Sequence, residues 1–467
     1  MTEYDLVIIG GGAGSFAAAI RADELQATTA VINTGLPLGG TCVNVGCVPS
    51  KTLLWASEVL HLATHHGVPG IDLSVKQFDF QRVVHDELAL VERMRHEKYE
   101  NVLRNLAHVT FIEGRAMFTS PEEVTVEGKP LRAKRFIIAT GSTATVPPIE
   151  GLRDVGYMTH IEALRLAEPP KELLIIGAGP LGLEFAQLYA RFGSTVTVLQ
   201  RAPSILPRAE PALTSRLAEI LTAEGITLKT GVMIERARTD KGKKVLSYRA
   251  AGHLQEVAGD EILLAAGKTP NTEALGLHRA QVDVDERQAI KVDPSFRTTR
   301  PHIYAVGDVT NLPLRLETTA GREGTLAAAN ALSGGQQRID YDAVPYTIFT
   351  DPQLAGVGWT EEEEMRRLGV CACRTVFFAA IPKALILRRT EGVIKMGIHP
   401  RTQQIVGVHI LAPQAGELVA QAMMLVKNKT TIEEVVQSLP MFPTLSEAIK
   451  IVALSFSKDI SKLSCCI

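Results

Sequence analysis

Apolar and polar positions follow one order twice along the chain: a short apolar run, a glycine turn, and a helical stretch. The first copy covers residues 5–14 (DLVIIGGGAG) and the second covers residues 172–182 (ELLIIGAGPLG). Short apolar runs bounded by turn residues are typical of buried parallel strands. Each copy later reaches another apolar run with a small-residue turn, at 136–142 and 262–268. The pattern predicts two copies of one nucleotide-binding architecture.

The pattern changes outside these copies. Residues 78–105 are charge-rich with a helical period, which predicts one long surface helix or two shorter ones. Beyond Tyr346 the chain alternates short apolar runs with amphipathic stretches. These predict strands and helices respectively, with strands at 393–396 and 404–411 and helices at 415–428 and 432–439.

We therefore expect an α/β protein with two doubly wound nucleotide-binding domains, for FAD and NADPH, and a C-terminal α+β dimerisation domain. Proline pairs at 147–148 and 169–170 mark the segment that connects the two copies. The first part of the FAD domain is predicted at 1–148 and the NADPH domain at 149–268. The second FAD or central part is predicted at 269–340, and the dimerisation domain with its tail at 341–467.

Composition narrows the class of protein. The 467 residues are too many for one core, and the formal net charge is -2 without a basic block. This argues against nucleic acid and against an anionic membrane surface as the main partner. Residues 173–190 are apolar but contain Glu184 and a glycine turn, so they predict no membrane span. The first strand begins at Tyr4 with no preceding signal peptide, so we expect a soluble, cytoplasmic protein.

The first glycine turn contains Gly10, Gly12 and Gly14, with Ser15 at the third position of the dinucleotide fingerprint. Such a turn lets the backbone approach a pyrophosphate at a helix N-terminus. At the end of the second strand, Asn33 replaces the usual acid; its amide still hydrogen-bonds a ribose, without a charge.

The second glycine turn is complete, with Gly177, Gly179 and Gly182. Its second strand leads into Arg201, not an acid, and Arg208 follows. An arginine at this place favours a 2′-phosphate, so the pattern predicts NADPH over NADH. The alternative is that both arginines are solvated surface charges.

Two of the six cysteines, Cys42 and Cys47, lie in GGTCVNVGCVPSK, a segment that ends at Lys51. A thiolate near a helix N-terminus or a lysine has a lowered pKa, and it exchanges electrons or binds soft metals. Cys371 and Cys373 are interpreted as buried inert thiols, because no second cluster lies near them in sequence.

This segment resembles the pyridine nucleotide-disulfide oxidoreductases, and the resemblance covers nearly the whole chain. It implies that Cys42 is the interchange thiol, that Cys47 lies against the flavin, and that Lys51 stabilises the flavin and pairs with Glu184. It also implies a homodimer formed by the C-terminal domain. The remaining cofactor-binding residues that it implies are Gly40, Thr41, Thr140, Gly141, Gly267 and Asp308.

Two departures within the family point to the substrate. Disulfide reductases of this family carry a proton-shuttling histidine where this chain has Phe442, although Glu447 remains. The chain ends in the vicinal thiols Cys465 and Cys466, as in the members that reduce mercuric ions. A soft dithiolate suits a soft cation, so we expect Hg(II), delivered as a thiolate complex, as substrate. The predicted metal ligands are the thiols of Cys42, Cys47, Cys465 and Cys466.

Some features leave alternatives open. Many mercuric-ion-reducing relatives carry an extra N-terminal metal-binding domain, and this sequence is predicted to be the form without it. Pro180 stands in the second glycine turn where relatives often carry a tyrosine that shields the flavin, so the sequence does not say which residue controls entry of the nicotinamide. A disulfide reductase for a small dithiol and a thiol protein that sequesters metal are the alternative functions.

Overall fold

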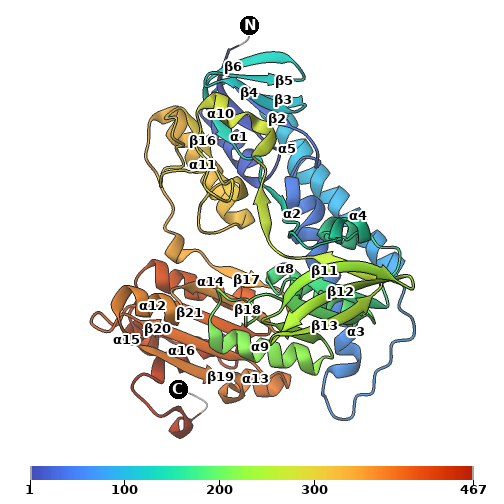
Figure 1. The fold of residues 1–467 in the computed structure, drawn as a ribbon. Coiled ribbons are helices and arrows are strands. Elements are labelled where there is room, and N and C mark those ends of the chain that lie inside the picture. Colours follow the sequence, from blue (N-terminus) through green and yellow to red (C-terminus); the bar gives the residue numbers. More distant parts are fainter. Residues whose placement is uncertain (1–2, 465–467) are drawn as a thin grey trace.

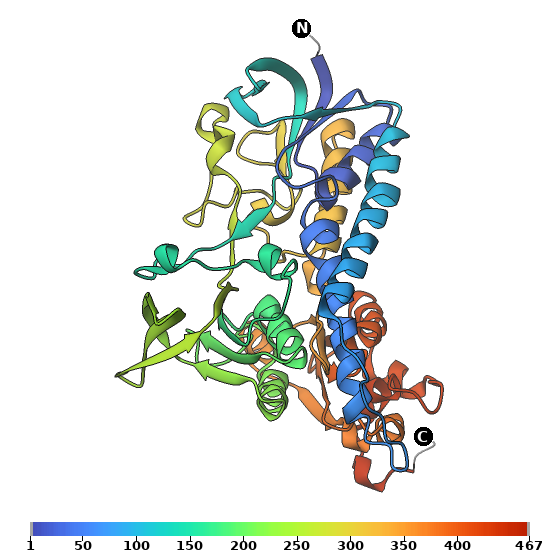
Figure 2. The same cartoon turned by 90° about the vertical axis from the view of Figure 1, so that its right-hand side faces the viewer.

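The computed structural model describes residues 3–464, and the strands of this part of the chain form five sheets in an elongated molecule (Figure 1). The first two sheets carry the glycine turns, and the last sheet lies in the C-terminal domain. Figure 2 shows the long helices of the first domain running down one side of the molecule.

The first sheet has the strand order β3-β2-β1-β6-β5-β4, with β16 also paired to β6. Strands β1, β2, β3, β6 and β16 are parallel where they pair, and β4, β5 and β6 form an antiparallel extension. Continuous apolar runs in β1 and β6 place Ile9 beside Ile138 in a buried core. The strand bounds are Glu3–Ile9 (β1), Thr29–Asn33 (β2), Val109–Glu113 (β3), Ala116–Ser120 (β4), Glu123–Val126 (β5), Lys129–Ile138 (β6) and Ile303–Ala305 (β16).

Two helices cross closely beside this sheet. A Cβ at Gly324 of α11 would lie 2.0 Å from the carbonyl oxygen of Gly14 in α1, so only glycine permits this backbone approach. The crossing fixes the first glycine turn against the second part of the domain. The helices of this domain are α1 (Ala13–Glu24), α2 (Gly40–Val45), α3 (Cys47–His65), α4 (Phe80–Arg95), α5 (Asn101–Arg104), α10 (Leu277–Ala280) and α11 (Glu317–Ser333).

The predicted helix at 78–105 is confirmed as nearly continuous helix. Helix α4 leads into a π-helical turn, His96–Glu100, and then into α5. Asp79 caps α4 by accepting a hydrogen bond from the Arg82 N–H, so the helix begins at Phe80.

The second nucleotide-binding unit repeats the parallel architecture with the strand order β10-β9-β8-β14. A separate antiparallel sheet, β11-β12-β13, packs beside it around the buried side chains of Leu246 and Tyr248. The elements are β8 (Glu172–Ile176), α8 (Pro180–Arg191), β9 (Thr195–Gln200), α9 (Pro211–Ala223), β10 (Thr227–Thr230), β11 (Met233–Asp240), β12 (Lys243–Ala250), β13 (His253–Gly259) and β14 (Glu261–Leu264), with the short helices α6 (Leu152–Val155) and α7 (His160–Ala163) before them.

A two-stranded ladder connects the two units, and the C-terminal domain follows. Its antiparallel sheet has the order β17-β18-β21-β20-β19 and is covered by helices that bury Val452 and Ala422. The elements are β7 (Ser142–Ala144) and β15 (Lys268–Pro270) in the ladder, then β17 (Tyr346–Ile348), β18 (Gln353–Gly358), α12 (Glu361–Leu368), β19 (Cys373–Phe377), α13 (Pro382–Leu387), β20 (Val393–Ile398), β21 (Ile405–Ala412), α14 (Ala415–Lys427), α15 (Ile432–Gln437) and α16 (Glu447–Leu454).

The predicted fold class is confirmed, and so are the predicted C-terminal strands and helices. Helix α15 ends at Gln437, short of the predicted Leu439. Pro440 follows Leu439, and a residue before proline disfavours the helical conformation. Among the described residues, no helix combines the length and the apolar character that crossing a bilayer needs.

Glu87 of α4 is a buried carboxyl group without a partner. The residue is 1% exposed, and neither carboxylate oxygen has a hydrogen-bond partner among the described residues. Burial raises its pKa to about 7, although the charge of Arg165 opposes the shift. The folded protein therefore favours the protonated form.

Replacing Glu87 with methionine is expected to stabilise the fold in a pH-dependent way. The folded pKa lies above the ordinary value of 4.5, so the contribution of this carboxyl to stability is present below 4.5 and is lost as the pH rises through about 7. We expect Glu87→Met to raise the free energy of unfolding by about 1–3 kcal/mol near pH 8 and by less near pH 5. Urea unfolding at both pH values measures this, with Glu92→Met on the exposed side of α4 as control. An equal gain at both values would contradict the assignment.

Candidate functional site

The first glycine turn lies between β1 and α1 and leaves its backbone open to a ligand. Gly10 has a φ of +131°, and a Cβ there would lie 2.3 Å from the Ala139 carbonyl oxygen. A Cβ at Gly40, at the start of α2, would lie 2.6 Å from the Cα of Gly12. The turn, α2 and the end of β6 therefore meet backbone to backbone, as close binding of a pyrophosphate requires.

The departures in this turn have structural reasons. Ser15 is fully buried, and its hydroxyl donates a 2.6 Å hydrogen bond to the Gly10 carbonyl. In the second turn a Cβ at Gly182 would lie 2.0 Å from the equivalent carbonyl of Gly177, so that turn tolerates only glycine. Asn33 lies over Gly11 and donates to the Leu36 carbonyl, which places its amide beside the first turn.

A cavity of about 620 Å³ opens beside the first turn. It extends from the glycine turn, past the cysteines, to the ends of the second unit and of the C-terminal domain. The predicted site residues that line it are Gly12, Gly14, Thr41, Cys42, Cys47, Lys51, Gly141, Glu184 and Asp308. Gly10, Gly40, Asn33 and Thr140 lie behind this lining, where Thr140 donates a 2.9 Å hydrogen bond to the Asn271 carbonyl.

The two cysteines in the cavity are free and chemically unequal. Cys42 lies in α2, and Cys47 is the first residue of α3, so its sulfur lies at a helix N-terminus. A hydrogen bond from the Cys42 thiol, together with the charge of Lys51, lowers the pKa of Cys47. The same hydrogen bond and burial raise the pKa of Cys42 far above its ordinary value. Cys47, beside Lys51 and at the helix N-terminus, is therefore the more acidic thiol of the pair.

Lys51 is held in place by two other parts of the chain. Its ammonium nitrogen lies 2.7 Å from a carboxylate oxygen of Glu184 in α8 and 4.7 Å from the ring centroid of Phe349. The Phe349 N–H donates a 2.9 Å hydrogen bond to the other oxygen of Glu184. Lys51 thus joins the first domain to the second unit and to the C-terminal domain, and its position beside Cys47 is fixed by both.

Asp308 lies in the 3₁₀ turn Gly307–Val309, which follows β16. The Ser142 hydroxyl donates a 2.6 Å hydrogen bond to its carboxylate. The carboxylate of the buried Glu323 accepts a 2.6 Å hydrogen bond from the Gly307 N–H. These two bonds fix the loop that carries Asp308 against the cavity.

Several functional neighbours were missed by the sequence analysis. Glu317, at the start of α11, lines the cavity, and its negative charge raises the pKa of both cysteines. Phe349 lies over Lys51, and Tyr99 has a pKa raised to about 12, mainly by burial and then by Cys42. None of them belongs to a glycine or cysteine motif, so only their position in the fold identifies them.

The second glycine turn lies between β8 and α8, with Pro180 as the first residue of the helix. Gly177 has a φ of +110°, and a Cβ there would lie 2.4 Å from the Ala265 carbonyl oxygen. Gln200 lies at the end of β9, where dinucleotide-binding folds usually carry an acidic residue. Its side-chain oxygen accepts a 3.3 Å hydrogen bond from the Ala178 N–H and so binds the strand end to the glycine turn.

Two predicted phosphate contacts lie on the surface of this unit. Arg201 and Arg208 are exposed, and neither has an ion pair among the described residues. Gly179 leaves open space beside the turn, where a Cβ would meet nothing within 4 Å. Gly267 has a φ of +117° and precedes β15, on the strand that joins the two units.

The C-terminal domain places Phe442 among exposed apolar side chains, since Leu439 and Met441 are also exposed. The buried carboxylate of Glu447 accepts a 3.1 Å hydrogen bond from the Thr444 N–H. Phe442 has no group that transfers a proton. Cys465 and Cys466 lie outside the described residues.

The interpretation of Cys371 and Cys373 as buried inert thiols is wrong. Both are partly exposed, and a disulfide joins them in the structure. The sequence analysis considered only a metal site completed by a second cluster, whereas the two sulfurs bond to each other across one intervening residue.

Known proteins resemble this chain over nearly its whole length. The family profile described as "Pyridine nucleotide-disulphide oxidoreductase" matches residues 4–332, and the profile of the family's dimerisation domain matches residues 344–453. A mercuric reductase of Bacillus cereus is 38% identical over 464 residues, which cover 99% of this chain and 73% of that protein. A mercuric reductase of Streptomyces lividans is 37% identical over 476 residues, which cover 100% of this chain and 98% of that protein.

The solved structures extend the comparison. The HOCl-induced flavoprotein disulfide reductase RclA of Escherichia coli superimposes with a TM-score of 0.86 and 28% sequence identity, and the match covers 97% of this chain and all of that one. The two profiles, the paired glycine turns and the cysteine pair in the cavity lead to one conclusion. This chain belongs to the pyridine nucleotide-disulphide oxidoreductases.

Proposed function

We propose that the protein reduces Hg(II) to elemental mercury with electrons from NADPH, through the cavity that contains Cys42 and Cys47. The observation that carries the proposal is Phe442, which occupies the place where the family's disulfide reductases have a proton-shuttling histidine. Cleavage of a disulfide releases a thiolate that needs a proton, whereas exchange of mercury between thiolates does not. The similarity to mercuric reductases supports the same substrate.

FAD and NADPH are the cofactors; NADPH would supply both electrons that convert Hg(II) to Hg(0), passing them through FAD and leaving NADP⁺ and one proton. The residues proposed to hold FAD are those of the first turn and its cavity, including Gly10, Gly12 and Asp308. A Cβ at Gly10 or Gly40 would meet neighbouring backbone, so the turn needs glycine at these positions, which supports this assignment.

The asymmetry of the cysteine pair is the chemical basis of the proposal. Hg(II) binds thiolates as a soft, two-coordinate cation. Cys47 has the lowered pKa beside Lys51, so it presents a thiolate, while Cys42 gives up its proton when the cation binds. The pair then holds the cation between two sulfurs inside the cavity. We propose Cys42 and Cys47 as ligands of Hg(II) during its reduction.

A second candidate function is reduction of a small disulfide, which the likeness to the flavoprotein disulfide reductase RclA favours. NADPH oxidation by the FAD-loaded protein, measured with thiol-bound Hg(II), lipoamide and glutathione disulfide in parallel, discriminates between the two. We expect turnover with Hg(II) and little with either disulfide. Phe442→His is the informative variant, because it restores the missing proton donor and is expected to raise disulfide turnover only. Faster NADPH oxidation with a disulfide than with Hg(II) in the unmodified protein would overturn the proposal.

Arg201 is expected to determine the preference for NADPH. Arg201→Glu should raise KM for NADPH far more than for NADH, because the loss of one charge-assisted phosphate contact costs about 1.5–3 kcal/mol. Steady-state kinetics with both nucleotides measures the difference, with the exposed Arg104→Glu of α5 as a charge-matched control. Equal KM values for the two nucleotides in the unmodified protein would contradict this role.

A further inference from the structure

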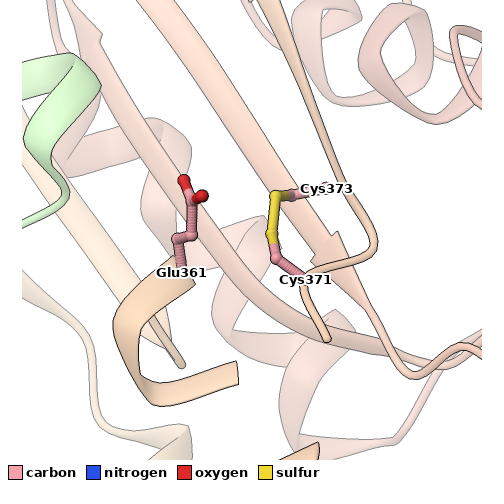
Figure 3. Close-up of side chains that lie close together, drawn as sticks. All are labelled: Glu361, Cys371 and Cys373. Carbon is pink, nitrogen blue, oxygen red and sulfur yellow. A yellow bond between two sulfur atoms is a disulfide. The ribbon is translucent and has the colours of Figure 1, made fainter. Parts of the chain in front are cut away.

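A second cluster of metal-binding side chains lies in the C-terminal domain, away from the cavity. The sulfurs of Cys371 and Cys373 and a carboxylate oxygen of Glu361 all lie within 4.8 Å of one another (Figure 3). Two ligands on opposite sides of a thiophilic divalent ion, at about 2.0–2.3 Å each, are separated by about 4–4.6 Å. The three donors are therefore close enough to share one ion.

The fold brings these donors together from two elements. Cys373 is the first residue of β19 and pairs with Gly397 of β20, which fixes the segment before it. Glu361 is in the first turn of α12, a helix that begins with a capping box between Thr360 and Glu363. Cys371 and Cys373 have Cα atoms 5.6 Å apart, so the chain itself holds the two sulfurs near each other.

A buried carboxyl group lies directly against this pair. Glu364 is 1% exposed, and it accepts a hydrogen bond from the N–H of Ala372, the residue between the two cysteines. Its second oxygen, Oε2, has no partner among the described residues. A Cβ at Gly397 would lie 1.6 Å from Oε1, so glycine is needed there to make room for the carboxyl. Glu364 thus holds the segment between the two cysteines in place, while the three clustered donors are Glu361, Cys371 and Cys373.

Charged side chains of both signs surround the pair. Lys395 forms a 2.6 Å ion pair with the buried Glu210 and also contacts Glu361. Arg374 keeps its guanidinium beside the pair, since it donates to the Cys373 carbonyl and lies 5.4 Å from the ring centroid of Phe456. Two cations thus face two carboxylates before any thiolate is counted. Two thiolates would add negative charge that a bound divalent cation would balance.

We propose that Cys371 and Cys373 in their reduced state, with the carboxylate of Glu361, bind a thiophilic divalent cation at a site separate from the flavin-side cysteines. The pair therefore has two forms: the disulfide, which excludes the ion, and the dithiol, which binds it. A small dithiol reduces the disulfide. The dithiol is oxidised to its own disulfide, and the two cysteines become thiols. The ion then replaces the two thiol protons, which are released to solvent.

Cadmium(II) is the probe, because it is thiophilic and tests the site independently of mercury reduction. The full-length, FAD-loaded protein is reduced with a dithiol, freed of it without oxygen, and dialysed against Cd(II). We expect Cys371→Ser with Cys373→Ser to bind one Cd(II) fewer per subunit than the unmodified protein. Oxidised protein should show the same deficit, and reduction should restore the binding. Equal Cd(II) content in the unmodified protein and the double variant would overturn the site.

Variants of α12 test the carboxylate. Glu361→Gln should weaken Cd(II) binding at this site by about tenfold or more, because it removes one donor. Glu362→Gln is the matched control, since Glu362 is an exposed acid one residue away. Equal weakening by both changes would mean that Glu361 acts only through its negative charge, which would contradict its role as a ligand. FAD content and the reduction of Hg(II) should stay unchanged in all these variants, so failure of this site and failure of the proposed function are distinguishable.

Discussion

Cys47→Ser is expected to abolish mercury reduction and the long-wavelength absorbance that a thiolate produces next to an oxidised flavin. Cys47 has the lowered pKa, lies at the N-terminus of α3 and faces the cavity beside Lys51, so its sulfur is the thiolate that such a band requires. Loss of one member of a catalytic unit reduces turnover by at least about 10³-fold. Absorbance spectra after addition of NADPH and the rate of Hg(0) release measure the two effects.

Cys42→Ser is expected to separate these effects. The thiolate of Cys47 remains, so the absorbance band should persist, while turnover with Hg(II) should fail because the second sulfur ligand is gone. Cys371→Ser serves as the control for a cysteine-to-serine change outside the cavity and should leave turnover unchanged. Normal Hg(II) reduction by both Cys42→Ser and Cys47→Ser would mean that the pair is structural.

Removal of the C-terminal thiols is expected to slow turnover when mercury arrives bound to bulky thiols. Two thiols on a tethered tail act at a high effective concentration, so Cys465→Ala with Cys466→Ala should slow this turnover by about 10²-fold or more. Mercury would pass from sulfur to sulfur, each new bond forming before an old one breaks, and the bare ion would never appear. Halide complexes that enter the cavity directly should be affected less. The same rates in the double variant and the unmodified protein on thiol-bound mercury would remove the delivery role.

The geometry of the subunit explains why we expect the tail to act on the partner. The last described residues follow the 3₁₀ turn Ile460–Lys462 near β19 at one end of the molecule, whereas α2, which contains Cys42, lies near its middle (Figure 1). The matched dimerisation domain supports a homodimer. In a mixed dimer, one subunit lacks the tail thiols and the other lacks Cys42. This mixed dimer should keep about half the activity of the unmodified dimer, because one of its two composite sites remains complete. Complete loss of activity would mean that each tail acts on its own subunit.

The fold was predictable because its determinants are local. Each glycine turn sits between a continuous apolar run and a helix, and this pattern identified β1, α1, β8 and α8 from residues close together in sequence. The strands β4 and β5 and the sheet β11–β13 were not predicted. Polar residues interrupt the apolar pattern of these strands, as in β13, where most residues are exposed.

The site was predictable only where a motif fixes it. The cysteine segment identified Cys42, Cys47 and Lys51, and the ion pair between Lys51 and Glu184 was expected from the family resemblance. Glu317 and Phe349 could not be found in this way, because they reach the cavity from segments far away in sequence. The side-chain cluster of Glu361, Cys371 and Cys373 was not predicted for the same reason, because Glu361 reaches the pair from α12.

Release of Hg(0) from the purified, FAD-loaded protein shows directly whether this chain reduces Hg(II). The assay supplies NADPH, Hg(II) and excess thiol, and it compares the mercury vapour released with the NADPH oxidised. We expect equal amounts of the two, because both are two-electron couples, and no vapour from the Cys47→Ser variant. NADPH oxidation without release of Hg(0), or release that persists in the Cys47→Ser variant, would contradict the account.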